Sequence, residues 1–221
     1  MRKRVFLHIP KCGGSTVRDE IIKVFDKNRV IKVYGFDAPN RYMTKESFIN
    51  EMEFGAGSFD AATGHFSLSD IKPFIRDLNL HVYTLIRDPI DREISDINYM
   101  KAKVNHRGHP WARQVNSQNL YNKLKGKPSG QAKILNIQSE NDVCTLKEMV
   151  SSYKLESYKK MLLDFGCLER EEQEIQIKNI TKDKTLTLED SFVCRSMLTY
   201  AQILTLKEHF HLDYLLYKEA K

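Results

Sequence analysis

Short apolar runs alternate with helically spaced apolar residues along the first hundred residues of the chain. The first run, residues 4–9, is rich in strand-forming residues and predicts a β-strand. Residues 10–14 contain a proline and two glycines, which end that strand in a loop. The apolar positions that follow at helical spacing are Val17, Ile21, Ile22, Val24 and Phe25. Since Asp19 and Glu20 would stand in the first turn, a helix is predicted from Ser15 onward.

The same alternation continues to about residue 100. Strands are predicted over residues 30–34, 61–64 and 81–86, and helices over residues 45–52 and from residue 90 to about 101. Strands that alternate with helices form a parallel sheet with helices packed on its faces. The predicted fold class is therefore α/β, with a P-loop-like parallel β-sheet flanked by helices.

The chain changes character after residue 100. Residues 101–113 are basic and polar and predict a loop. Residues 157–163 and 197–209 have helical spacing, and residues 175–180 predict one more strand. We therefore predict a single domain over residues 1–221, with an α/β core in residues 1–100 and a mainly helical portion in residues 101–221.

The composition is that of a soluble globular protein. Of 221 residues, 41% are hydrophobic and 29% are charged, so the chain can bury a substantial core. No apolar run is long enough to span a membrane. The basic residues at the N-terminus are not followed by the apolar core of a signal peptide, and we expect a cytoplasmic protein.

The cysteines and the net charge indicate which metals and partner molecules the chain is expected to bind. The four cysteines, Cys12, Cys144, Cys167 and Cys194, are widely spaced and form no CxxC pair, so we expect reduced thiols and no metal site. A net charge of +6 favours an anionic partner. Nucleic acid is disfavoured, because the chain has no arginine-rich tail, zinc finger or aromatic RNA-binding signature.

Residues 8–16 (HIPKCGGST) have the parts of an anion-binding loop. A loop between a strand and a helix directs backbone N–H groups along the helix axis, and these groups favour an anion. Gly13 and Gly14 allow close approach of the backbone, while Lys11 adds a charge. The lysine precedes the glycines, unlike the order of a Walker A loop, so a P-loop kinase is disfavoured.

The same segment also fits a different enzyme. Cys12 and Arg18 are separated by five residues, which is the C-x5-R spacing of cysteine-dependent tyrosine phosphatases. A thiolate at the start of a helix would be activated there. Against this reading, Asp19 places an acidic residue directly after the arginine that would bind phosphate.

A second strand–turn–helix junction follows the strand at residues 81–86. Arg87 stands at the carboxyl end of that strand, and Ser95 follows eight residues later, about two turns into the next helix. Both side chains could therefore reach one phosphate. A donor molecule with two separate phosphate groups needs two such junctions, and a phosphatase does not.

The two motifs together resemble those of sulfotransferases that use 3′-phosphoadenosine 5′-phosphosulfate (PAPS). In the branch that includes the heparan sulfate 2-O-sulfotransferases and their bacterial relatives, the first motif is close to IPKTGGTS and the second is close to IRDPxxRxxS. This chain has IPKCGGST at residues 9–16 and IRDPIDREIS at residues 86–95. The resemblance implies that residues 1–100 bind the donor and residues 101–221 lie on the acceptor and adenine side.

The resemblance also implies roles for individual residues. Lys11, Cys12, Gly13, Gly14, Ser15 and Thr16 would hold the 5′-phosphosulfate. Arg87 and Ser95 would hold the 3′-phosphate. Cys12 replaces the usual threonine, which removes a hydroxyl donor and keeps the backbone N–H, so we expect weaker binding and retained function.

A third match identifies a candidate base. Residues 64–70 (GHFSLSD) resemble the GHxSxxD-like stretch of the 2-O-sulfotransferases, whose histidine is the catalytic base. The resemblance assigns that role to His65, while Lys11 would stabilise the leaving phosphate. Thr63 stands where those enzymes have a second histidine, so no two-histidine arrangement is expected.

The function implied is transfer of a sulfuryl group from PAPS to an acceptor hydroxyl. The product of the donor is adenosine 3′,5′-bisphosphate (PAP), no metal is required, and the acceptor is expected to be a carbohydrate. The alternatives are the C-x5-R phosphatase and a non-catalytic nucleotide-binding relative. His8 is predicted to be a packing or supporting residue, Arg92 to pair with Asp88 or Asp96, and Tyr99 and Trp111 to line either the core or the acceptor site. His106, Arg107 and His109 are predicted to lie in a solvated loop.

Overall fold

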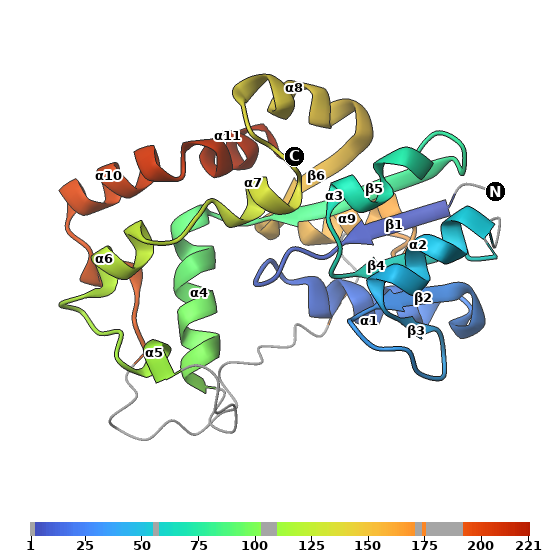
Figure 1. The fold of residues 1–221 in the computed structure, drawn as a ribbon, viewed down its shortest axis with the longest axis horizontal. Coiled ribbons are helices and arrows are strands. Elements are labelled where there is room, and N and C mark those ends of the chain that lie inside the picture. The colour runs from blue at the N-terminus through green and yellow to red at the C-terminus, as the bar shows by residue number, and fades with distance from the viewer. Residues whose placement is uncertain (1–2, 55–57, 103–109, 171–173, 176–191) are drawn as a thin grey trace.

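A computed structural model describes residues 3–54, 58–102, 110–170, 174–175 and 192–221. The described residues form one six-stranded, all-parallel sheet with the strand order β3-β2-β4-β1-β5-β6 (Figure 1). The strands are β1 (Lys3–Leu7), β2 (Val30–Val33), β3 (Tyr42–Met43), β4 (Ala61–Gly64), β5 (Leu80–Ile86) and β6 (Val150–Lys154). The predicted fold class is confirmed.

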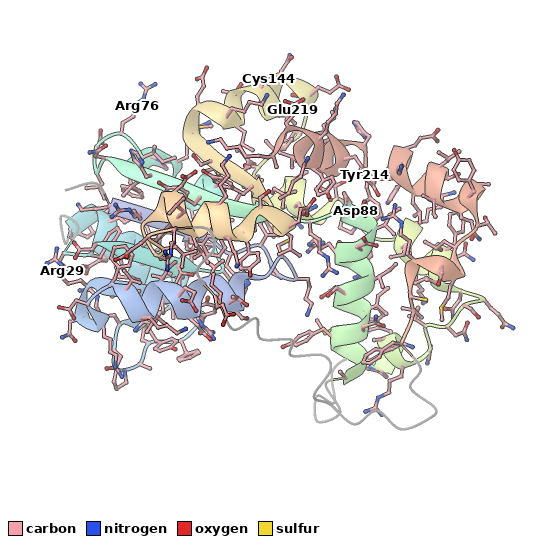
Figure 2. All side chains as sticks on the ribbon, turned by 180° about the vertical axis from the view of Figure 1, so that it is seen from behind. Arg29, Arg76, Asp88, Cys144, Tyr214 and Glu219 are labelled. Carbon is pink, nitrogen blue, oxygen red and sulfur yellow. The ribbon has the colours of Figure 1, made fainter. Side chains whose placement is uncertain are left out.

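Helices cover the sheet on both faces. The helices around the sheet are α1 (Gly14–Val24), α2 (Lys45–Phe54), α3 (Leu68–Ile71), α7 (Gly130–Ile134), α8 (Glu140–Met149), α9 (Tyr158–Phe165) and α11 (His211–Glu219). Helices α1 and α9 pack against each other on the face turned toward the reader in Figure 2. Helix α2 packs over β2 and β3, and α11 packs against α7 and α8 near β6. The inner strands β2 and β4 are buried along their whole length and β5 at six of its seven positions, as expected for a parallel sheet.

A separate helical lobe lies beside the sheet (Figure 1). It consists of α4 (Pro89–Ala102), α5 (Pro110–Arg113), α6 (Leu120–Lys125) and α10 (Tyr200–His209). Short 3₁₀ helices complete the described elements at Lys27–Arg29, Lys72–Phe74, Leu155–Ser157 and Arg195–Met197. The lobe has its own apolar cluster, which includes Ile90, Ile97, Leu120, Leu206 and Phe210. Because α4 continues directly from β5, this lobe is anchored at the edge of the sheet where the candidate site lies.

The strand order places a crevice between β1 and β5. From β1 the chain runs through α1 to β2, and from β5 it runs through α4 toward β6 on the opposite side. Ligands of open α/β sheets bind at such a reversal, outside the carboxyl ends of the strands. The two motifs, residues 8–16 and residues 86–95, both begin at these ends.

Several elements differ from the sequence prediction. Strand β6 was not predicted, and it adds a strand from the second half of the chain to the sheet. The last long helix was predicted from residue 197 but begins at Tyr200, because the Thr199 side chain caps it by accepting from the Gln202 N–H. In the predicted loop at 101–113, residues 110–113 form α5 and 103–109 lie outside the described residues. Residues 176–180 of the strand predicted at 175–180 also lie outside them.

No helix within the described ranges is long and apolar enough to cross a membrane.

Candidate active site

The loop after β1 leads into α1 with an unusual backbone. Gly13 is the N-cap of α1 at φ 77°, a conformation that glycine adopts without strain. Lys11 has φ 70°, which is costly for a residue with a side chain and is typical of functional sites. A helix leaves its first N–H groups without intrahelical acceptors, so the start of α1 can bind an anion. The start of α1 lies within residues 11–16, where the sequence analysis predicted an anion-binding loop.

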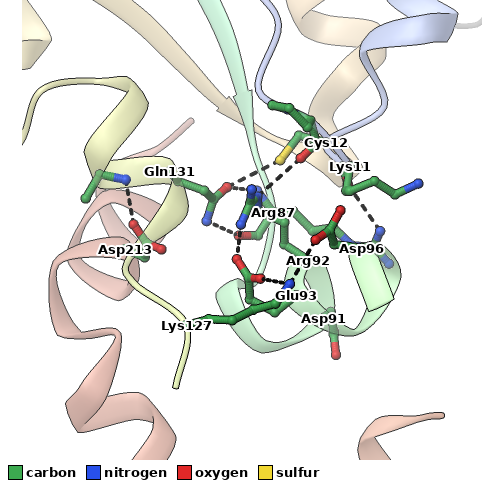
Figure 3. A network of polar contacts seen from close by, with 12 residues as sticks. Lys11, Cys12, Arg87, Asp91, Arg92, Glu93, Asp96, Lys127, Gln131 and Asp213 are labelled. Atoms are coloured by element: carbon green, nitrogen blue, oxygen red, sulfur yellow. Dashed lines mark hydrogen bonds and ion pairs between the residues drawn. The ribbon is translucent and has the colours of Figure 1, made fainter. Parts of the chain in front are cut away.

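Two arginines from the second motif hold the carbonyl groups of this loop (Figure 3). Arg92 Nε donates to the Pro10 carbonyl at 3.2 Å, and an Arg87 guanidinium nitrogen donates to the Lys11 carbonyl at 3.3 Å. Arg92 also forms a buried ion pair with Glu93. The predicted pairing of Arg92 with Asp88 or Asp96 was wrong. The Arg92 side chain turns inward to the loop, and Asp96 forms its ion pair with Lys127 at 2.8 Å.

One face of α4 is turned toward the loop. Arg92 on that face reaches Pro10, and the Lys11 Nζ lies 4.0 Å from the centre of the Tyr99 ring. Ser95 stands three residues after Arg92 and four before Tyr99, so it lies on the same helical face and is half-buried. The structure thus brings Lys11, Arg87 and the Ser95 face of α4 together where the two motifs meet.

Gln131 links the two motifs, and the sequence analysis missed it. Its side chain is fully buried, and its Oε1 accepts from the Arg87 N–H at 2.9 Å and from the Cys12 thiol at 3.4 Å. Its Nε2 donates to the Arg87 carbonyl at 2.9 Å. Asp213, also buried, accepts from the neighbouring Ala132 N–H at 2.6 Å and holds the start of α7. The amide of Gln131 therefore fixes the first loop to the end of β5 (Figure 3).

Cys12 is built into the core of this junction. Its side chain is 1% exposed, and burial raises the pKa of the thiol to about 12. Its backbone N–H donates to the Ile9 carbonyl at 3.2 Å, so both of its donors are used within the protein. Arg18 points elsewhere and pairs with Asp19 at 2.9 Å. This geometry does not place a nucleophilic thiolate opposite an arginine that could bind phosphate. The phosphatase alternative is therefore not favoured.

Replacing Cys12 with serine should therefore leave catalysis largely intact. The serine hydroxyl can donate to Gln131 as the thiol does, and we expect turnover within about threefold of the unmodified protein. A cysteine phosphatase would lose all turnover with this substitution. Alkylation of the folded protein provides a second measurement: the exposed Cys144 and Cys194 should react quickly, and Cys12 should not react.

Three neighbouring strands are each followed by a residue with a polar ring: His8 after β1, His65 after β4 and Tyr34 after β2. Leu7, Gly64 and Val33 are register partners across β1, β4 and β2, so the residues that follow them are neighbours. The ring centres of His8 and His65 lie 4.4 Å apart in a stacked arrangement, and the Tyr34 ring meets His65 edge-on at 5.0 Å. The expectation that no two-histidine arrangement exists was wrong, because the second imidazole comes from β1 and not from the position of Thr63.

The protonation of His65 follows from its contacts. Its Nδ1 lies 3.1 Å from the His8 carbonyl, which can only accept, so Nδ1 carries the proton and Nε2 keeps a lone pair. Partial desolvation lowers the pKa of His65, and the nearby Arg18 charge lowers it further, while the hydrogen bond to His8 acts in the opposite direction. An exposed neutral imidazole with a basic Nε2 can accept a proton at pH 7.

A cavity of about 320 Å³ opens beside His65. Its lining consists of His8, Pro10, Lys45, His65, Phe66, Ser67, Asp70 and Ile134. The Lys45 Nζ lies 3.3 Å from an Asp70 oxygen, and Ser67 holds the same carboxylate through its hydroxyl at 2.6 Å. The cavity therefore joins an apolar surface to one ion pair and one imidazole.

Of the remaining predicted residues, Trp111 is within the described ranges and lies in the helical lobe. Trp111 packs against the apolar cluster of the helical lobe, with the Lys127 Nζ 5.5 Å from its ring centre. His106, Arg107 and His109 lie outside the described residues. Within the described ranges, no group of three or more His, Cys, Asp or Glu side chains is placed to hold a metal ion.

Comparison with known proteins supports the fold. Neither a protein-family model nor a curated protein sequence matches the chain. Among solved structures, the mouse sulfotransferase SULT7A1 complexed with PAP matches over 99% of this chain and 89% of its own, with 13% identity and a TM-score of 0.52. Retinol dehydratase also matches, with retinol and PAP (TM-score 0.47, 13% identity, 100% of this chain and 83% of that one) and with androsterone and PAP (0.47, 13%, 100% and 82%). The chain has the fold of the mouse sulfotransferase.

Proposed function

We propose that this protein is a PAPS-dependent O-sulfotransferase. The observation that carries the proposal is the meeting of two anion-binding junctions at the reversal between β1 and β5, where Arg87 contacts the Lys11 carbonyl directly. One doubly phosphorylated adenosine spans such a crevice, with its 5′ end at residues 11–16 and its 3′-phosphate near Arg87 and Ser95. The mouse sulfotransferase whose fold the chain shares was complexed with PAP, which supports a nucleotide of this kind as the ligand.

The chemistry is an in-line displacement at sulfur. The acceptor hydroxyl attacks the sulfur, and its proton passes to Nε2 of His65 as the new S–O bond forms. The S–O bond to the 5′-phosphate breaks, and its electron pair remains on the phosphate. Lys11 and the N–H groups at the start of α1 stabilise the charge that develops there. These steps need positioning and electrostatics and no metal.

We assign the acceptor to the cavity beside His65 and propose a carbohydrate. The cavity volume of about 320 Å³ is near the lower end for small-molecule sites, roughly 300–1,000 Å³. Phe66, Pro10 and Ile134 offer an apolar surface to the face of a sugar ring, and the Lys45–Asp70 pair offers hydrogen bonds to its hydroxyls. All four cysteines are free thiols, which fits the cytoplasm as the compartment.

Calorimetry with PAP, followed by transfer from labelled PAPS, tests this function. We expect saturable PAP binding and label transfer to glycosides above a no-acceptor background. Arg87→Ala should weaken PAP binding at least tenfold, because a charge-assisted contact to the 3′-phosphate is lost. Arg76→Ala is the matched control, since Arg76 is exposed and far from the crevice (Figure 2), and it should bind PAP normally.

Each result of this experiment has a distinct meaning. No PAP binding would contradict the proposal as a whole. PAP binding without transfer to any hydroxyl acceptor would support the non-catalytic nucleotide-binding alternative. Transfer to phenols or other small alcohols but not to glycosides would keep the sulfotransferase and remove the carbohydrate assignment.

A further inference from the structure

His8 is a buried titratable residue at the centre of the site that the mechanism above does not use. Its side chain is 7% exposed, and it lines the cavity beside His65. The stacked His65 ring covers it at 4.4 Å. If His8 served only to fill space, an apolar ring could replace it at little cost. Its polar contacts therefore decide what it does.

The two edges of the His8 ring face different partners. Nδ1 lies 3.3 Å from the Tyr34 hydroxyl. The opposite edge lies against Gly14, where a Cβ would meet Cδ2 at 1.9 Å and Nε2 at 2.1 Å. Only glycine fits at that position, and the close approach brings the Nε2 edge of His8 to the first residue of α1. His8 thus connects Tyr34 on one side with the anion cradle on the other.

The tautomer of His8 depends on the Tyr34 hydroxyl. The Arg18 guanidinium lies 5.6 Å from the Tyr34 ring centre. Burial raises the pKa of Tyr34, while the nearby Thr63 and Arg18 side chains oppose that shift. The protonated phenol can donate its hydrogen to Nδ1 of a neutral His8, 3.3 Å away. In that arrangement the proton of a neutral His8 resides on Nε2, the atom beside Gly14.

His8 stays neutral throughout the working range of pH. Burial lowers its pKa to about 3, and the nearby His65, Arg18 and Lys11 lower it in the same direction. A neutral imidazole beside Lys11 can donate a hydrogen bond without adding a further positive charge to the cradle. It also cannot compete with His65 for the proton of the acceptor.

We propose that His8 is a catalytic hydrogen-bond donor, whose Nε2–H binds an oxygen of the sulfuryl group as it passes to the acceptor. This inference rests on the proposed function. His8 gains and loses no proton in the step: the acceptor proton goes to His65, and the breaking S–O bond leaves its electrons on the 5′-phosphate. The contact strengthens as charge spreads over the sulfuryl oxygens in the transition state.

The test compares variants that keep or remove the donor. His8→Phe keeps a stacking ring and removes the N–H, and we expect the turnover number to fall about 10²-fold. His8→Gln places an amide N–H near the position of Nε2 and should recover at least tenfold of that loss. Tyr34→Phe removes the group that sets the tautomer and should lower turnover about tenfold, while Tyr42→Phe, a neighbouring tyrosine, is the matched control and should leave it unchanged.

PAP affinity and the pH profile separate this role from a structural one. PAP lacks the sulfuryl group, so its dissociation constant should stay within about threefold in every variant. Turnover of His8→Phe above a third of the unmodified value, a parallel loss of PAP affinity, or failure of His8→Gln to recover activity would each overturn the proposal. So would a shift of the acid limb of the pH profile, because His8 would then act through His65.

Two further results keep the test decisive. If His8→Phe does not fold, His8→Gln and Tyr34→Phe carry the comparison against Tyr42→Phe. If the unmodified protein neither binds PAP nor transfers label, the proposed function fails first, and that result is distinct from an active enzyme that tolerates His8→Phe.

Discussion

Replacing Lys11 with methionine should reduce the turnover number by about 10²–10³-fold. The leaving 5′-phosphate gains negative charge as the S–O bond breaks, and Lys11 supplies the positive charge in the loop that cradles it. The structure holds this residue in a defined place: its φ is 70°, its carbonyl is held by Arg87, and its ammonium group lies 4.0 Å from the Tyr99 ring centre. Such preorganisation makes the charge effective in the transition state.

Single-turnover transfer at saturating PAPS and acceptor measures this loss directly. PAP affinity should fall less than the rate does, because the phosphate of PAP is held in part by backbone N–H groups that methionine leaves in place. Lys160→Met on the exposed surface of α9 removes the same charge away from the crevice and is the control. If Lys11→Met retained a third or more of the turnover of this control, Lys11 would not be part of the catalytic machinery.

The sheet edge that carries the candidate site could be predicted from local patterns. Strands β1 and β5 have strong apolar runs, each followed by a proline three residues after the strand ends, and the short strand β4 ends at Gly64. Because parallel strands end at a common edge, the positions of Lys11, His65 and Arg87 in one region follow from strand ends alone. The α/β class and the start of α1 were predicted for the same reason.

Strand β6 could not be predicted in the same way. It is five residues long with the sequence VSSYK, and only two of its side chains are buried. Its stability comes from pairing with β5, where Val150 is the register partner of Val82. The partner residue is 68 positions away in the sequence, so pairing of this kind leaves little signal in the local pattern of apolar residues.

The residues that connect the two motifs were also beyond local patterns. Gln131 follows a glycine in a short helix, and nothing in that segment indicates that its amide bridges Cys12 and Arg87. The inward turn of Arg92 has the same cause, since its acceptor, the Pro10 carbonyl, is 82 residues away in the sequence. Side-chain partners separated this far are set by tertiary packing and not by spacing along a helix.

The pairing of His8 with His65 lies between these cases. Each histidine directly follows a strand, and the sequence analysis predicted both strands. The missing information was the strand order: only when β1 and β4 are neighbours in register do the two rings stack. The proposed base and the ring stacked on it therefore come from two segments that are 57 residues apart and become adjacent through the sheet.

Replacing His65 with alanine should reduce turnover by about 10²–10⁴-fold and leave PAP affinity within about threefold. General base catalysis by a positioned histidine contributes an effect of that size. The imidazole lies at the cavity, and its Nδ1 contacts the His8 carbonyl, which precedes the loop at residues 11–16, so binding of the nucleotide should survive. Transfer rate and PAP calorimetry on the same preparation measure the two effects separately.

The pH dependence of the unmodified enzyme gives an independent check on His65. The groups around it are Arg18 on α1, Tyr34 and His8 at the strand ends, and Lys45 and Asp70 at the cavity. Burial and the Arg18 charge lower the pKa of His65 below its usual value of 6.5. The basic form therefore predominates at pH 7, and activity should be lost only as pH falls through this lowered pKa.

The acid limb of the pH profile tests whether His65 is the group that accepts the proton. In the unmodified enzyme kcat/KM should be flat at neutral and mildly alkaline pH and should fall at acid pH through the lowered pKa of His65, because protonated His65 cannot accept the acceptor proton. In His65→Ala the residual rate should lose this limb altogether. An unchanged limb in the variant would mean that another group takes the proton. Since the pKa of His8 is about 3 and its Nδ1 is bonded to Tyr34, His8 could not be that group above pH 5.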